Sequence, residues 1–229
     1  MIETRLVKRY KRFLADVEFP DGHIETVHCP NPGAMQGLTQ PGIRAWVSDS
    51  RNPKRKLQFT LELVEVEDVL IGVNTNRPNR LAVEAIEAGR IAKLARYDRL
   101  RTEVKYGENS RIDILLETDG QPDVYVEVKN VHFRRTPALD EFPDCVTARG
   151  AKHLHEMARE VAKGNRAVML YVIQRGDGKH FGFANDLDPN YVKAFREAHA
   201  SGVEALAIRC DVSVDRIVAR DELPVILPV

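Results

Sequence analysis

The pattern of apolar and polar residues changes near residue 76. Before that point, apolar and polar side chains alternate in short runs that are separated by turn residues such as Pro20-Asp21-Gly22. A period of two is typical of strands with one buried face, and no run in this part has the period of a helix. The strand candidates are Val7–Phe19, His23–His28, Ile43–Val47, Leu57–Val66 and Val69–Val73. Five short strands predict a small barrel, so we expect residues 1–76 to form an all-β, OB-like nucleic-acid-binding module.

Residues 77–229 alternate between helices and strands. A helix is predicted from Arg80 to about Leu94, with Asn79 as its N-cap. Glycine and proline signals bound two further helices, Arg149–Lys163 and a segment that begins at Asp188-Pro189. The predicted strands between and after them are Arg101–Tyr106, Arg111–Glu117, Val124–Asn130, Ala167–Gln174 and Val203–Cys210. This order predicts an α/β domain built on a mixed sheet.

Composition excludes several classes of protein. The longest apolar stretch, Ala167–Ile173, is far shorter than the roughly 20 residues that a membrane-spanning helix needs. The first residues carry charges without an apolar segment behind them, so we expect no secretory signal. Three cysteines, widely spaced, predict reduced thiols in a cytoplasmic protein. The 34 basic and 34 acidic residues balance, so any nucleic acid must be bound by local basic clusters.

The segment Val124–Asn130 carries the most chemistry. In a strand, Glu127 and Lys129 point to the same face, about 6–7 Å apart, while the valines between them point to the other. Asp113 lies between two isoleucines on the preceding strand, so it also faces away from an apolar layer. If the two strands pair, Asp113 and Glu127 converge and Lys129 lies beside them.

Two carboxylates with room between them form a site of hard oxygen ligands that suits Mg²⁺ or Mn²⁺. Such a cation polarises a phosphodiester and lowers the pKa of a bound water. Lys129 could then orient the attacking water. The residues thus favour phosphodiester hydrolysis with Asp113 and Glu127 as metal ligands, although a Glu-x-Lys pair on a strand is also common as a solvated ion pair.

This arrangement resembles the PD-(D/E)xK nuclease superfamily. The resemblance rests on Asp113 followed by Glu127-x-Lys129 on the next strand. It implies that Glu84, on the preceding helix, is the additional acidic residue that many members carry there. Ile112, instead of the frequent proline, precedes the aspartate. The resemblance therefore implies a catalytic set of Glu84, Asp113, Glu127 and Lys129.

Longer blocks resemble the sugar fermentation stimulation protein A family. These blocks are His28–Met35, Gly72–Leu81, Glu103–Leu116, Tyr125–Val131 and Phe142–Leu154. The resemblance extends over nearly the whole chain. It implies an N-terminal OB-fold joined to a nuclease-like domain, binding to DNA, and a genetic link to sugar use through regulation. It does not decide whether the protein cleaves its target.

Two groups of basic residues are candidates for contact with nucleic acid. The first group, Lys8, Arg9, Lys11 and Arg12, is interleaved with Tyr10 and Phe13, which is typical of a strand that grips a backbone and stacks bases. Its alternative is a solvated edge strand that charge protects from aggregation. The second group is Arg149 and Lys152, which share a helix face with His153 and Glu156. That face would either contact phosphates beside the metal or be a solvated, charged surface.

The leading hypothesis is a DNA-binding protein with a Mg²⁺-dependent nuclease site. The alternative is a catalytically silent DNA-binding regulator of sugar metabolism genes that uses the cleft only to hold DNA. A sugar-binding sensor is a third hypothesis, with little support, because Trp46 is the only tryptophan and no stacking platform for carbohydrate is evident.

Overall fold

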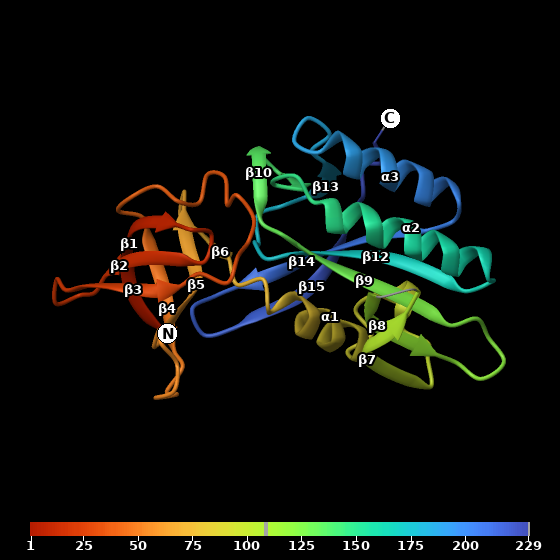
Figure 1. Cartoon of the computed structure of the whole chain (residues 1–229), viewed down its shortest axis with the longest axis horizontal. Coiled ribbons are helices and arrows are strands. Elements are labelled where there is room, and N and C mark those ends of the chain that lie inside the picture. The colour runs from red at the N-terminus through yellow and green to blue at the C-terminus, as the bar shows by residue number, and fades with distance from the viewer. Residues whose placement is uncertain (108–109, 229) are drawn as a thin grey trace.

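The N-terminal domain is a closed barrel (Figure 1). The computed structural model describes residues 1–107 and 110–228. The barrel strands are β1 (Ile2–Tyr10), β2 (Leu14–Glu18), β3 (Ile24–His28), β4 (Arg44–Asp49) and β5 (Phe59–Val66), and β6 (Val69–Gly72) extends the sheet. The order is β3-β2-β1-β4-β5-β6, and a parallel pairing of His28 with Thr60 joins β3 to β5 and closes the barrel. The OB-like barrel predicted from the alternating runs is therefore confirmed.

The barrel interior follows from the alternation of its strands. On β2, Ala15 and Val17 are fully buried, while their neighbours Asp16 and Glu18 are not. Inward-facing residues from the other strands and from the loop before β4 complete one apolar cluster that includes Leu6, Val27 and Met35. The period of two thus places one apolar face of each strand inside the barrel.

The prediction of one strand from Val7 to Phe19 is wrong. The chain reverses within it, and β1 and β2 pair as an antiparallel hairpin. The turn is made by Lys11 and Arg12, with φ values of 49° and 62°. The loop between the paired residues Tyr10 and Leu14 has three residues. The positive φ values at its first two positions are adopted most readily by Gly and Asn, so two basic residues gave no turn signal. The basic run is also not an edge strand, because β1 lies between β2 and β4.

The C-terminal domain is built on a mixed sheet, as predicted, and this sheet has six strands, of which β15 (Ile217–Leu223) was not predicted. Its strands are β7 (Arg99–Tyr106), β8 (Ser110–Glu117), β9 (Val124–Val131), β12 (Arg166–Ile173), β14 (Glu204–Val212) and β15 (Ile217–Leu223), and their order is β15-β14-β12-β9-β8-β7. The strands β9, β12 and β14 are parallel to one another. A small sheet that was not predicted contains β10 (Phe133–Thr136), β11 (Leu139–Phe142) and β13 (His180–Phe183).

Helices cover both faces of the large sheet (Figure 1). The helix α1 (Pro78–Glu87) packs on one face, and α2 (Ala148–Ala162) and α3 (Pro189–Ala200) pack on the other. A short 3₁₀ turn, Ala92–Leu94, follows α1. Because both faces are covered, β12 is buried almost along its whole length, which explains its uninterrupted apolar sequence. None of the helices in the described residues has the length and apolar character needed to cross a membrane.

The predicted ends of α2 and α3 agree with the structure, but those of α1 do not. Asp188 caps α3 by accepting a hydrogen bond from the Tyr191 N–H, as its sequence signal indicated. The helix α1 begins at Pro78, so Asn79 lies inside it instead of capping it. It also ends seven residues before Leu94, because Gly89 adopts a φ of 66° and breaks the helix.

The two domains are joined through backbone as well as side chains. The Gly72 N–H at the end of β6 donates to the Gln174 carbonyl, which follows β12. A β-bridge between Ile71 and Arg175 extends this pairing. On the other side, the Met35 N–H of the barrel domain donates to the Asp144 carboxylate over 3.0 Å. The barrel is therefore fixed against the sheet at two separated places.

Candidate active site

The strand β9 divides its side chains as the alternation predicted. Val126 and Val128 pack in the apolar cluster beneath α1. Glu127 and Lys129 point to the opposite face, where α2 lies. Glu127 is only 3% exposed, so its carboxylate is held inside the protein.

Asp113 lies where β8 and β9 cease to pair. The antiparallel register between the two strands runs only from Ile114 to Leu116 on the β8 side. At the next position, the Val128 N–H donates to Asp113 Oδ2 over 2.7 Å, so a side-chain carboxylate replaces the strand carbonyl as acceptor. Asn79, in the first turn of α1, donates to Oδ1 over 2.8 Å. The opening of the ladder thus holds the Asp113 carboxylate beside β9.

Glu127 accepts two hydrogen bonds on one oxygen and none on the other. The Lys129 ammonium donates to Oε1 over 2.7 Å, and His153 on α2 contacts the same oxygen through Nδ1. Arg149 Nε donates to His153 Nε2 over 3.3 Å, so Nδ1 carries the ring proton that is donated to Glu127. The second oxygen, Oε2, is buried and has no hydrogen-bond partner among the described residues.

The electrostatics of the two carboxylates differ. Burial and the negative charge of Glu127 raise the pKa of Asp113, against the lowering effect of the Val128 N–H and Lys129. Burial also acts to raise the pKa of Glu127, but the charge of Lys129 and the bond from His153 outweigh it, and this pKa is lowered. Tyr106 lies close by, and burial together with the charge of Glu127 raises its pKa strongly. The surroundings therefore stabilise the anion of Glu127, whereas they destabilise the anion of Asp113.

The residues present fit a divalent cation. A buried carboxylate oxygen without a partner is costly, and a nearby carboxylate with a raised pKa indicates that further positive charge would be stabilising. In the part of the chain that the structure describes, no cluster of three or more His, Cys, Asp or Glu side chains is arranged as a metal site. Because the described residues offer only two carboxylates at the site, Asp113 and Glu127, a cation here would need the Val128 carbonyl and water as further ligands. This set of oxygen ligands suits Mg²⁺ or Mn²⁺.

Glu84 is not brought to these residues. Its carboxylate pairs with Arg80 over 2.6 Å on the surface of α1. The residue of α1 that contacts Asp113 is Asn79, and five helical positions separate the two, which places Glu84 about 140° around the helix. The contact of Asn79 was missed because its sequence position indicated a cap.

The predicted basic residues of the barrel separate into two groups. The Arg9 guanidinium donates to the carbonyls of Arg12, Asn31 and Gly33 over 2.7–2.9 Å, so it ties the hairpin turn to a loop. Lys8 pairs with Asp16 over 3.3 Å. In the described chain the side chains of Lys11 and Arg12, at the turn itself, form no hydrogen bond or ion pair and are exposed.

The polar face of α2 is buried at two of its four positions. His153 is 5% exposed and Glu156 is 4% exposed, whereas Arg149 is exposed and Lys152 pairs with Glu156 over 3.7 Å. The role of His153 was missed in the sequence, because a polar helix face is usually solvated. Its spacing of four residues from Arg149 is the signal that could have indicated it.

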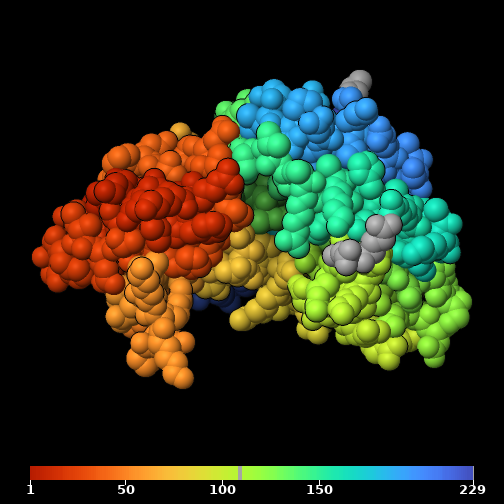
Figure 2. Space-filling view, in the orientation of Figure 1, coloured from red at the N-terminus to blue at the C-terminus, as the bar shows by residue number. Residues whose placement is uncertain are grey.

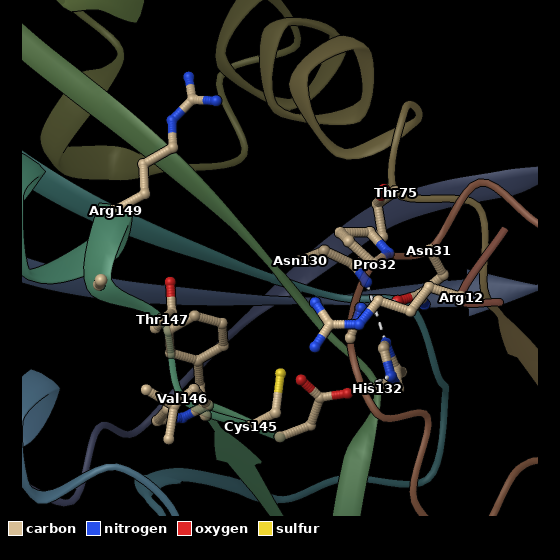
Figure 3. A pocket seen from close by; sticks show the side chains of 15 residues that line it. Arg12, Asn31, Pro32, Thr75, Asn130, His132, Cys145, Val146, Thr147 and Arg149 are labelled. Atoms are coloured by element: carbon tan, nitrogen blue, oxygen red, sulfur yellow. Dashed lines mark hydrogen bonds and ion pairs between the residues drawn. The ribbon is translucent and has the colours of Figure 1, made fainter.

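A cavity of about 410 Å³ opens between the two domains next to this site. Arg12 and the segment Asn31–Gly33 line it from the barrel, and Asn130 and the segment Phe142–Arg149 line it from the other domain (Figure 3). In the space-filling view a hollow separates the barrel from α2, with β-strand residues at its floor (Figure 2). Arg149 lines the cavity and also bonds His153, whose ring contacts Glu127, so the cavity adjoins the carboxylate site.

Comparisons with known proteins agree with this architecture. The SfsA N-terminal OB domain matches residues 7–73, and the sugar fermentation stimulation protein RE domain matches residues 76–216. Sugar fermentation stimulation protein homologs from Maricaulis maris and Brucella ovis are 56% and 55% identical, over 95% and 98% of this chain and 93% and 94% of their own lengths.

A solved structure shares the whole fold. The structure of Pyrococcus furiosus SfsA in complex with Ca²⁺ superimposes with a TM-score of 0.87 at 24% identity, covering 98% of this chain and 95% of that one. The two family models match both domains and span the motif blocks between residues 28 and 154. The chain therefore belongs to the sugar fermentation stimulation protein family.

Proposed function

We propose that this protein binds DNA and hydrolyses its phosphodiester bonds with Mg²⁺ or Mn²⁺, as a PD-(D/E)xK-type nuclease. The observation that carries the proposal is the arrangement of Asp113, Glu127 and Lys129 at the opening between β8 and β9. The partnerless, buried oxygen of Glu127 is the atom that a cation would satisfy. The Ca²⁺ bound by the Pyrococcus furiosus relative is also a hard cation that prefers oxygen ligands.

Each residue of the site has a distinct part in this reaction. When bound, the cation would polarise the scissile phosphate and acidify a water. Lys129 would hold that water or the developing negative charge, because its side chain is 14% exposed and its ammonium already lies at the Glu127 carboxylate. His153 fixes the orientation of Glu127 through Oε1, and Arg149 fixes the tautomer of His153. Asn79 and the Val128 N–H hold both oxygens of Asp113 in place.

Binding of DNA would use the exposed cations at the rim of this site. Lys11 and Arg12 at the hairpin turn and Arg149 on α2 are free to contact phosphates, and Lys152 pairs only weakly. Lys8 and Arg9 support the hairpin instead. The three cysteines are unpaired, which fits a reducing compartment such as the cytoplasm.

A catalytically silent regulator of sugar metabolism genes is the second candidate. The observation that favours it is the saturation of Glu127 Oε1 by Lys129 and His153, which is also how a structural ion pair would look. This candidate retains binding to DNA but needs no turnover.

The test is cleavage of end-labelled single- and double-stranded DNA and RNA in Mg²⁺, Mn²⁺ or Ca²⁺, with the wild type and Asp113→Asn purified side by side. We expect cleavage in Mg²⁺ or Mn²⁺ that falls by at least about 10²-fold in the variant, since a metal ligand is lost. Exposed Asp215→Asn is the matched control and should cleave like the wild type. Equal cleavage by Asp113→Asn would indicate a contaminant. Binding without cleavage by the wild type would establish the silent regulator.

A further inference from the structure

The cavity between the domains combines cations with an apolar wall. Arg12 reaches into it from the barrel (Figure 3). Arg149, in the first turn of α2, lies at the border of the lining, and its guanidinium extends away from the other labelled side chains. Phe142, Pro143 and Val146 supply the apolar part of the lining. Val146 is 72% exposed, which is unusual for a large aliphatic side chain at the rim of a polar cleft. The site thus offers an apolar surface flanked by positive charge.

The backbone of the hairpin turn indicates that Arg12 is held in place at the cavity. Both Lys11 and Arg12 have positive φ values, a conformation that costs side-chain-bearing residues free energy. The Arg9 guanidinium offsets this cost, because it hydrogen-bonds to the Arg12 carbonyl in the turn and to carbonyls of the segment Asn31–Gly33. The strained turn is therefore held in one position, and that position puts an unpartnered guanidinium at the cavity.

The acidic residue in the lining does not oppose an anion. The Asp144 carboxylate accepts a hydrogen bond from the Met35 N–H and lies 3.4 Å from His132. On the opposite wall, Thr147 caps α2, and the helix N-terminus directs its positive dipole end into the cavity. His132 is itself 4% exposed, and its Nε2 atom lies against the Asp144 carboxylate.

From these features we propose that the cavity receives one unpaired nucleotide, and that the protein therefore selects single-stranded or frayed nucleic acid. The base lies on the wall formed by Phe142, Pro143 and Val146, and Arg12 and Arg149 bind the flanking phosphates. A volume of about 410 Å³ is within the range of roughly 300–1,000 Å³ typical of small-ligand pockets. Only an unpaired base can present its face to such a wall, because the bases of a duplex cover each other.

The cavity adjoins the carboxylates, so the proposal names the substrate of the proposed nuclease and rests on that function. The connection is made by Arg149 and not along β9, because Asn130 and Lys129 are consecutive on the strand and point to opposite faces. Arg149 lines the cavity and also contacts His153, which bonds Glu127. A strand that places one nucleotide in the cavity thus leads its next phosphate toward Asp113 and Glu127.

The test measures binding in EDTA, where cleavage cannot interfere. The probes are a short fluorescein-labelled single strand and the blunt duplex of the same sequence, each in a DNA and an RNA form, followed by fluorescence anisotropy. We expect the single strand to bind at least about tenfold more tightly than the duplex. Val146→Glu should weaken single-strand binding about tenfold and change duplex binding less than twofold. Arg12→Ala, which removes a phosphate contact, should weaken single-strand binding about tenfold and duplex binding as well.

The control variants carry the same chemical changes away from the cavity. Ile24→Glu alters an apolar residue that is 60% exposed on β3, and Lys54→Ala removes an exposed cation of the same domain. Both should leave single-strand binding within about twofold of the wild type. A single-strand affinity that Val146→Glu and Arg12→Ala leave unchanged would overturn the proposal while nucleic-acid binding stands. If no probe binds, the proposed function itself is overturned, so the two failures are distinguishable.

Discussion

Asp144 joins the domains through a carboxylate whose pKa is strongly altered. Burial acts to raise this pKa, but the hydrogen bond and positive charge of His132 and the bond from the Met35 N–H outweigh it and lower the pKa to about 2. The side chain is 13% exposed, so solvent screens these contacts little. The perturbation we consider is acid, compared between the wild type and Asp144→Asn.

The sign and size of the effect follow from proton linkage. Because the folded pKa lies below the reference value of 3.8, the stabilisation is fully present above pH 3.8 and is lost as the pH falls through about 2. A shift of this size corresponds to about 2.4 kcal/mol of unfolding free energy at pH 5 and above. The same relation gives about 1.3 kcal/mol at pH 3 and about 0.4 kcal/mol at pH 2.

Urea unfolding at pH 5, pH 3 and pH 2, followed by circular dichroism, measures this contribution directly. The stability difference between the wild type and Asp144→Asn should shrink along that series by about 2 kcal/mol. Asp215→Asn, an exposed control, should differ from the wild type by less than about 0.5 kcal/mol throughout. A wild-type advantage over Asp144→Asn that is the same at pH 5 and pH 2 would refute the electrostatic reasoning.

Three further predictions concern stability. Arg9→Ala removes the charge-assisted hydrogen bonds that one guanidinium nitrogen, Nη2, shares among three carbonyl oxygens, and should lower the free energy of unfolding by about 3 kcal/mol. Lys54→Ala should change it by less than about 0.5 kcal/mol in the same urea titration. Gly72→Ala should cost about 1–3 kcal/mol, because its Cβ would lie 2.6 Å from Gln174 Oε1 and 2.9 Å from the Cβ of that residue; an unchanged urea midpoint would contradict this close approach. Saturating Ca²⁺ should stabilise the wild type by roughly 2.7 kcal/mol at a hundredfold excess over Kd and leave Asp113→Asn unchanged, as differential scanning calorimetry can show.

The sequence predicts those parts of this protein in which local pattern and tertiary position agree. The alternation of Glu127 and Lys129 with valines indicates one polar and one apolar face, and β9 has both. The uninterrupted apolar run that became β12 is readable for a related reason, since helices cover both faces of the sheet. Caps such as Asp188 carry their own hydrogen-bond chemistry and are equally readable.

The failures have physical reasons of their own. The β1–β2 turn lacks Gly and Asn because Arg9 supplies from outside the hydrogen bonds that hold it. The strands β10 and β11 are short and rich in charge, and they are stabilised by ion pairs such as Arg134 with Asp140, which no period reveals.

Within the candidate site, sequence located the residues on β8 and β9 but misplaced those on the helices. Alternation indicates which face each strand residue occupies. The expectation that Asp113 and Glu127 converge also needed β8 and β9 to be neighbours in the sheet, which they are. Side chains project from a helix in all directions around its axis. A shift of a few residues at the start of the helix therefore decides which side chain faces the sheet. Asn79 therefore takes the position expected of Glu84, and His153 becomes a buried contact instead of a solvated one.

The pairing of Gly72 and Ile71 with the chain after β12 makes the barrel a continuation of the sheet's own hydrogen bonding. A hinge between the domains would have to break backbone bonds, so we expect the opening between them to keep a constant width with and without ligand. Such a protein would select its target by the width of the segment that fits the opening, without a closing motion of the domains.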